Sequence, residues 1–357
     1  MSEENPPEPA SEQGSEQVSD EVVIDEAPKA KFGKQQIIAT VVTLLVLVLV
    51  FFVVFPKFAD YSQAWDAIQN MSVGSLVALI AVTIFLIIAY VWPYQAALPG
   101  LKYRPGFMVR QTSFMISNSI PAGGAFGIGV QYAMLHQQGF TPAVSTTAIG
   151  ITSVWNTFVT LTFPVIAVVL LLITGQATGS AFLAAAAGVV IVGAMIGGFA
   201  WALSSESRAR GLGELGNRIV RWGARLIKKD DFEPTLDSGL VNFRESTVDV
   251  IKDRWRLITG TNTLQQFLQF LILFIALIGI GSVGTDGVTF AEAFAAFALS
   301  RLATFIPVTP GGLGTVDAAM TALLVTAGAS ESDALAAVLV WRALTYFPQI
   351  FIGIGTF

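Results

Sequence analysis

Six uninterrupted apolar runs, each long enough to cross a lipid bilayer, constrain this chain more than any other feature of its sequence. A transmembrane helix needs roughly 20 apolar residues. Charged residues make up only 13% of the chain and the mean hydropathy is +0.67, whereas a soluble domain is roughly 25% charged. The sequence therefore predicts an all-α integral membrane protein. The predicted spans are Ile37–Phe55, Val73–Ala97, Val144–Thr174, Ala181–Leu203, Leu257–Gly281 and Leu335–Phe357.

The third run is too long for one straight crossing. We therefore expect part of it to lie at the membrane interface, or the helix to be kinked at Pro164. Residues 1–34 differ from the rest, because nine acidic residues fall within the first 26 and the segment is rich in Pro, Ser and Glu. This composition predicts a disordered cytoplasmic tail ahead of a transmembrane domain over residues 35–357.

Side chains for common kinds of catalysis are scarce. The chain has no cysteine and a single histidine, His136, so disulfides, thiolate metal sites and histidine clusters are excluded. We expect His136 to be a solvated residue at the cytoplasmic edge of the membrane. With no acid–base pair evident, the sequence predicts a protein that is not an enzyme and has no catalytic residues, metal or cofactor.

Lysine and arginine are distributed unevenly between the loops, and cytoplasmic loops carry the excess. Three lysines lie at residues 29–34, three basic residues lie at 102–110, and eleven lie at 204–256, whereas residues 282–290 have none. Both termini are therefore predicted to be cytoplasmic in a multi-pass protein of the cytoplasmic membrane. Arg110 is interpreted as part of this topology signal.

Two remaining apolar segments, about 107–139 and 290–329, are broken by proline and glycine. Each connects two spans in a way that requires it to return to the side from which it entered. Non-helical backbone at membrane depth is tolerated only where protein or a water-filled cavity surrounds it. We therefore predict two re-entrant broken-helix hairpins in addition to the six spans.

The two broken segments resemble each other. One contains "SNSIPAGGAFGIGVQYAM" and the other "LATFIPVTPGGLGTVDAAM", so both have Ile-Pro, Gly-Gly, a further Gly and Ala-Met in the same order. A Trp-polar pair and a proline follow each: Trp155, Asn156 and Pro164, then Trp341, Arg342 and Pro348. With opposite predicted orientations, this indicates an inverted-topology repeat, a common transporter architecture with its binding site at the midplane. Repeat 1 is about 73–174 and repeat 2 about 257–357, separated by the basic cytoplasmic segment 204–256. The alternative is that Gly and Pro only permit close packing or a kink.

The motif "GGLGT" is predicted to expose backbone amides at a helix N-terminus, which attracts anions. Arg301 would add a forked cation suited to phosphate. Asp317 could cap these amides and pair with Arg301 or Arg342, or it could act as a gating or coupling carboxylate. Arg342 could bind substrate or form a structural bridge with the aspartate. The predicted substrate-binding residues are Arg301, Pro307, Pro310, Gly311, Gly312, Gly314, Asp317 and Arg342 in the second half, and Pro121, Gly123, Gly124, Gly127, Gln131 and Asn156 in the first.

The cytoplasmic stretch "GLGELGNRIVRWGARLIKK" has apolar residues on one helical face and basic residues on the others. This pattern predicts an amphipathic helix that lies on anionic lipid, with a solvated linker as the alternative.

The ordered series from Arg301 to Arg342 resembles the flippase-like transmembrane domain of the lysylphosphatidylglycerol synthases (the multiple peptide resistance factor type). The matching residues are Arg301, Pro307, Pro310, Gly311, Gly312, Gly314, Asp317 and Arg342. The resemblance covers about 40–357. It departs from the family at Asp317, where the family commonly has Glu, and at Gln131 and Asn156, where the family often has charged residues. It implies lipid translocation by a stand-alone member that does not synthesise aminoacylated lipid, since no soluble aminoacyltransferase domain is expected.

The leading functional prediction is a flippase or transporter of an anionic, phosphate-bearing lipid, either a phospholipid or a polyprenyl-phosphate-linked lipid, in the bacterial cell envelope. One alternative is an ion-coupled transporter of a small organic anion. Another is a non-catalytic membrane partner of a glycosyl- or acyltransferase. The predicted partners are anionic membrane lipids, with a homodimer and cell-envelope biosynthetic enzymes as further candidates and no nucleic acid.

The predicted topology can be tested with cysteines, because the chain has none of its own. Cysteines introduced at Thr285 and Ser205 should react with an impermeant maleimide from outside and inside the cell respectively. Labelling of both positions from the same side would contradict the inverted arrangement.

Overall fold

In a computed structural model, the described residues are 61–119, 123–176, 179–226, 236–284, 287–305 and 310–356. Their regular structure is helical apart from an isolated β-bridge between Val283 and Val288. The all-α prediction is therefore confirmed. The predicted acidic tail and the first predicted span lie outside the described residues.

The helices of the first half follow one another with short breaks. They are α3 (Tyr61–Gln69), α4 (Val73–Ala89), α5 (Trp92–Ala97), α6 (Tyr103–Ser119), α7 (Gly123–Gln137), α8 (Pro142–Ile173) and α9 (Gly179–Leu203). The second half contains α10 (Glu206–Leu226), α11 (Leu236–Ile280), α12 (Phe290–Ser300), the 3₁₀ segments η2 (Arg301–Phe305) and η3 (Pro310–Gly312), α13 (Thr315–Thr326) and α14 (Glu331–Thr356).

Local sequence explains where several helices begin. The Ser72 hydroxyl accepts from the Ser75 amide at the start of α4, and Thr141 caps α8 just before a proline at its first position. Thr289 and Glu292 form a reciprocal capping box at the start of α12. These caps replace the hydrogen-bond partners that the first backbone amides of a helix lack.

Four helical stretches are long and apolar enough to cross a membrane: Val73–Ala97, Pro142–Ile173, Thr247–Ile280 and Glu331–Thr356. They correspond to the second, third, fifth and sixth predicted spans. The fourth predicted span is α9, which is bent by 114° from α10 within the pair Val190–Leu203 and Glu206–Arg218. Pro164 lies inside α8, a helix of 32 residues that continues past the proline to Ile173. The total of six spans remains a prediction.

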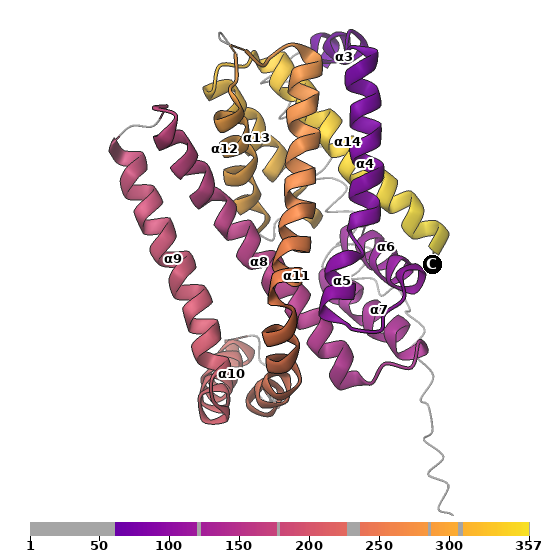
Figure 1. The fold of residues 1–357 in the computed structure, drawn as a ribbon, viewed down its shortest axis with the longest axis vertical. Coiled ribbons are helices and arrows are strands. Elements are labelled where there is room, and N and C mark those ends of the chain that lie inside the picture. Colours follow the sequence, from indigo (N-terminus) through magenta and orange to yellow (C-terminus); the bar gives the residue numbers. More distant parts are fainter. Residues whose placement is uncertain are drawn as a thin grey trace, which may run out of the picture.

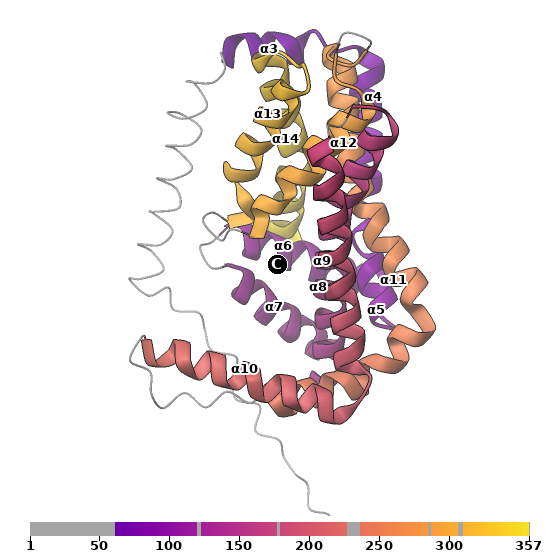
Figure 2. The same ribbon diagram turned by 90° about the vertical axis from the view of Figure 1, so that its left-hand side faces the viewer.

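The two broken hairpins lie in opposite halves of the molecule (Figures 1 and 2). Helices α12 and α13 occupy the half that ends at α3, whereas α6 and α7 occupy the half that ends at α10. Helix α11 runs through both halves, and α14 descends from the α3 end to reach α6. This placement is the one that an inverted repeat requires, although the duplication itself remains a prediction.

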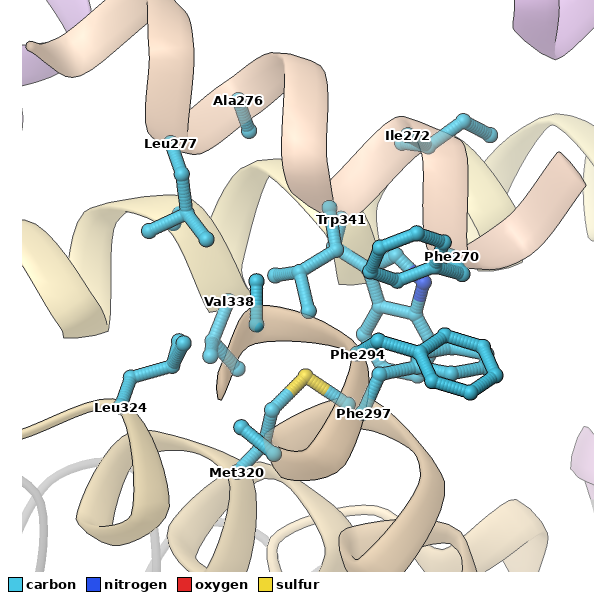
Figure 3. Packing of buried hydrophobic residues seen from close by; sticks show 14 of the residues in the cluster. Phe270, Ile272, Ala276, Leu277, Phe294, Phe297, Met320, Leu324, Val338 and Trp341 are labelled. Carbon is cyan, nitrogen blue, oxygen red and sulfur yellow. The ribbon is translucent and has the colours of Figure 1, made fainter. Parts of the chain in front are cut away.

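A cluster of large side chains fixes the second hairpin to the helices behind it. Figure 3 shows Phe294 and Phe297 of α12 and Met320 of α13 packed against Phe270 of α11 and Trp341 of α14. The rings of Phe270 and Phe294 are 5.0 Å apart, edge to face. Since lipid is as apolar as these side chains, their close fit rather than water exclusion holds the helices together. The hairpin is thus supported on one side by dense packing.

Large apolar side chains remain exposed along the outer faces of the long helices. On α4 they recur with helical spacing, for example at Leu76, Ile80 and Ile84. An exposed apolar surface of this extent is what a membrane protein presents to lipid. This exposed apolar surface indicates that lipid surrounds α4, α8, α9 and α14.

Helix α14 lies close against α6 at Gly353. A Cβ at this position would overlap the Cβ of Met115 and lie 2.7 Å from the backbone oxygen of Gln111. The Thr112 and Thr356 hydroxyls are 3.0 Å apart at the same contact. A small residue is therefore required where the last span meets the first hairpin.

We predict that Gly353→Ala lowers the free energy of unfolding by about 1–3 kcal/mol, because α6 must move to admit the methyl group. Gly355→Ala is the matched control, since a Cβ there meets nothing within 4 Å and should gain up to about 1 kcal/mol of helix propensity. Unfolding in mixed SDS micelles measures both variants. Equal effects at the two positions would contradict the close contact.

Candidate functional site

The chain between α12 and α13 leaves helical geometry at three glycines. Gly311, Gly312 and Gly314 have φ values of +62°, +67° and +83°, which side chains with a Cβ rarely adopt. A Cβ on Gly311 would also overlap the side-chain oxygen of Asn118, and one on Gly312 would come within 2.7 Å of Val316. Glycine is therefore needed here both for backbone conformation and for space.

Asp317, in the first turn of α13, uses both carboxylate oxygens within the protein. One oxygen, Oδ2, accepts a 2.8 Å hydrogen bond from the Gly314 amide. The other, Oδ1, accepts a 2.7 Å bond from Nε of Arg342, whose Nη2 is 2.6 Å away. Asp317 is only 2% exposed. The sequence left open whether Asp317 is a structural residue or a gating or coupling carboxylate. This geometry favours the structural role, in which Asp317 caps α13 and forms an ion pair with Arg342.

Arg342 is held in place by its neighbour in the chain. The adjacent Trp341 is 1% exposed, and its indole donates a 3.0 Å hydrogen bond to the carbonyl of Gln269 on α11. This anchor fixes the rotation of α14, so that Arg342 points at α13. The Arg342 guanidinium also lies 5.7 Å from the ring centroid of Tyr346.

Arg301 is the first residue after α12, and it forms no ion pair with the described residues. Its Nε is buried and has no hydrogen-bond partner there. Its guanidinium carbon lies 6.0 Å from the Phe297 ring centroid, and the group interacts electrostatically with Arg342 and Tyr90. An arginine stays protonated under these conditions. Arg301 is thus a cation at the start of η2, which packs against α13, and its Nε has no partner among the described residues.

The tips of the two hairpins meet at this point. Asn118, near the end of α6, lies against Gly311, and its carbonyl accepts a 2.8 Å hydrogen bond from the Tyr346 hydroxyl. The Phe114 ring packs edge to face on Tyr346 at 5.7 Å. The first hairpin, the second hairpin and α14 therefore share one junction.

The sequence analysis interpreted Arg110 as a topology signal and did not predict that it lies near the hairpin junction. The Arg110 guanidinium lies over two rings, 4.5 Å from the centroid of Tyr90 and 4.9 Å from that of Phe114. Tyr90 interacts electrostatically with Arg110 and with Arg301. The depth of Arg110 inside an apolar segment, well past Lys102 and Arg104, was the signal that could have revealed it.

These contacts leave an imbalance of charge. Arg110, Arg301 and Arg342 gather around the junction, and in the described part of the chain Asp317 is the only carboxylate that pairs with any of them. Three cations and one anion leave two positive charges in excess. Charged groups at membrane depth are costly and usually mark a substrate site.

Four of the six first-half residues predicted to bind substrate, Gly123, Gly127, Gln131 and Asn156, make contacts within the protein, and their role in substrate binding remains a prediction. Gly123 and Gly127 pack α7 against α6, where a Cβ would meet the Ser117 backbone and hydroxyl respectively. Gln131 is buried, and it donates to the Ser113 hydroxyl at 2.6 Å and accepts from Tyr94 at 3.4 Å. Gly124 is exposed, with nothing within 4 Å of an added Cβ.

Asn156 belongs to a different polar cluster. Its side-chain oxygen accepts a 3.2 Å hydrogen bond from Gln266, which also donates to the Thr160 hydroxyl at 3.0 Å. Gln266 belongs to a buried amide stripe on α11 that its helical spacing could have revealed: Asn262, Gln265, Gln266 and Gln269. Among the described residues, neither Asn156 nor Gln131 forms a hydrogen bond with Arg301. Pro121 and Pro307 lie outside the described residues, and Pro310 begins η3.

The fold and the junction together define a multi-pass helical membrane protein with a cationic centre between two broken hairpins. The chain belongs to the family described as the lysylphosphatidylglycerol synthase TM region, whose model matches residues 36–353. This match confirms the family predicted from the series Arg301 to Arg342. No individually curated protein matches the chain by sequence.

We predict that Asp317→Asn destabilises the protein by about 3–5 kcal/mol, because an asparagine oxygen can still cap Gly314 while Arg342 becomes an unpaired buried cation. Combining Asp317→Asn with Arg342→Gln should recover most of the loss. Unfolding in mixed SDS micelles gives the coupling between the two sites. Additive losses would show that the ion pair does not hold the junction.

Proposed function

We propose that this protein is a lipid transporter, a flippase or scramblase that moves an anionic phosphate-bearing lipid across the membrane. The lipid class is either a phospholipid or a polyprenyl-phosphate-linked lipid. The proposal assigns no catalytic role, metal or cofactor to the chain. Membership of a family named for a lipid synthase is consistent with a lipid substrate.

The observation that carries this proposal is the Arg301 guanidinium, which forms no ion pair with any described residue. Asp317 is occupied by Arg342 and by the Gly314 amide, so it does not neutralise Arg301. A planar guanidinium offers phosphate two parallel hydrogen bonds, and the N-terminus of α13 adds a partial positive charge. An anionic head group would satisfy both, and Arg110 would supply the second excess positive charge.

The surroundings of Arg301 favour an amphiphile over a small soluble anion. The next turn, η2, exposes apolar side chains, with Leu302 at 36% and Phe305 at 49% exposure. A cation beside exposed apolar side chains suits a head group joined to hydrocarbon tails. An ion-coupled carrier of a small organic anion would instead be expected to enclose its substrate in a cavity with no lateral opening to lipid.

We further propose that the protein lies in the bacterial cytoplasmic membrane with the α10 end and both termini in the cytoplasm. The described residues of the α3 end have no lysine or arginine, whereas α10 carries Arg208, Arg210, Arg218 and Arg221, which supports this orientation. A homodimer and cell-envelope biosynthetic enzymes are proposed as partners.

Fluorescent-lipid translocation in proteoliposomes tests the proposal. Arg301→Ala should reduce the rate about 10- to 100-fold, the loss expected for a charge-assisted hydrogen-bonding site. Arg301→Lys should fall in between, because a point charge cannot replace a bidentate fork. Arg104→Gln is the matched control, since Arg104 is exposed near the membrane edge and should translocate at the wild-type rate.

Monodisperse elution of each variant excludes misfolding as the cause of a loss. Wild-type rates in well-folded Arg301→Ala would overturn the phosphate-site proposal. Efflux of a soluble organic anion without lipid movement would favour the carrier of a small anion. No movement of either by wild-type protein would favour a non-transporting membrane partner.

A further inference from the structure

Helices α8, α9 and α11 neighbour one another at one side of the molecule (Figure 1). A cavity lined by residues of these three helices lies away from the hairpin junction. Its volume is about 590 Å³, within the roughly 300–1,000 Å³ of ligand sites. The lining includes Phe158 and Ile166 of α8, Ile196 and Ala200 of α9, and Trp255 of α11. We call this cavity the α9 groove. It opens sideways, since Ile166, Ile196 and Trp255 are 46%, 44% and 50% exposed.

The walls of the α9 groove offer a ligand almost no hydrogen bonds. The Thr162 hydroxyl donates to the Phe158 carbonyl of its own helix at 2.7 Å. The Thr259 hydroxyl accepts from the Trp155 indole at 2.9 Å. With these polar groups already satisfied, the interior suits hydrocarbon and excludes a polar ligand.

One end of the α9 groove is cationic. Lys252 lines it and forms no ion pair with any described residue. Arg208 donates to the Ser204 hydroxyl at 2.5 Å, and Arg244 donates to the Leu203 carbonyl at 2.8 Å. Since Leu203 and Ser204 also line the groove, three basic side chains converge on its mouth.

The acidic residues near this mouth form no ion pair with its three basic side chains in the described part of the chain. Glu206 pairs with Arg210 at 2.7 Å. Asp249 and Asp253 lie on α11 close to Lys252, but neither forms an ion pair in the part of the chain that the structure describes. No carboxylate of the described residues therefore occupies Lys252, Arg208 or Arg244, and these side chains can bind an anionic head group.

The dimensions of the α9 groove match one membrane leaflet. Its lining on α9 runs from Ile196 to Ser204, about 12 Å at 1.5 Å per residue. Half of a bilayer core is roughly 15 Å thick. Trp201 and Trp255, both about half exposed at this end, are the residue type found at the head-group level.

We propose that the α9 groove binds an acyl chain of an anionic phospholipid from the leaflet at the α10 end, with the head group held by Lys252, Arg208 and Arg244. This lipid is a bound component of the fold rather than the transported substrate. The proposal does not depend on transport, because the groove shares no residue with the hairpin junction.

Native mass spectrometry of the purified full chain, exchanged into phosphatidylglycerol or phosphatidylcholine, tests this site. Wild-type protein should retain phosphatidylglycerol in preference to phosphatidylcholine. Ala200→Phe, which fills the groove, should abolish retention. Ala194→Phe is the matched control, because Ala194 is exposed on the same helix but does not line the groove.

Lys252→Gln should reduce the preference for phosphatidylglycerol about tenfold, the loss of one charge-assisted contact. Lys102→Gln, at an exposed lysine outside the groove, should leave it unchanged. Equal retention of the two lipids by wild-type protein would overturn the head-group assignment. Retention unaffected by Ala200→Phe, or a dimer in place of bound lipid, would overturn the site.

Discussion

The arrangement of the cationic centre depends on how Asp317 divides its two oxygens. One oxygen closes the start of α13 on Gly314, and the other fixes Arg342 on α14. A broken helix in a membrane has backbone amides that lipid cannot satisfy. The Asp317 carboxylate accepts a hydrogen bond from one of these amides and neutralises one buried arginine at the same time. Its one negative charge is shared among three arginines, and this is why the centre keeps an excess of positive charge.

Much of the fold could be predicted from the sequence because lipid imposes simple rules on composition. The runs at Val73–Ala97 and in α8, α11 and α14 had to be helical spans. The break at Gly311–Gly314 could be predicted, since glycine and proline interrupt an otherwise apolar segment. The family was predicted from the order of the motif residues between Arg301 and Arg342. The pairing of Asp317 with Arg342 rather than Arg301 was not fixed, because it depends on the rotation that Trp341 gives to α14.

The role of each glycine could not be predicted, because similar sequence motifs adopt different backbone conformations in the two hairpins. Gly311, Gly312 and Gly314 turn the chain with positive φ, whereas Gly123 and Gly127 lie inside α7 and allow it to approach α6. A pattern of glycines cannot distinguish a turn from a close contact. Likewise, the stacking of Arg110 on Tyr90 joins α6 to the end of α4, and only the three-dimensional packing brings them together.

Helix α14 contacts both hairpins, and this has a mechanical consequence. Its N-terminal half binds α13 through Arg342, and its C-terminal half meets α6 through Tyr346 and Gly353. In the lipid transporter that we propose, a shift of one hairpin would therefore be transmitted through α14 to the other. Opening to one side of the membrane would then be tied to closing on the other, and such reciprocity separates a carrier from an open conduit.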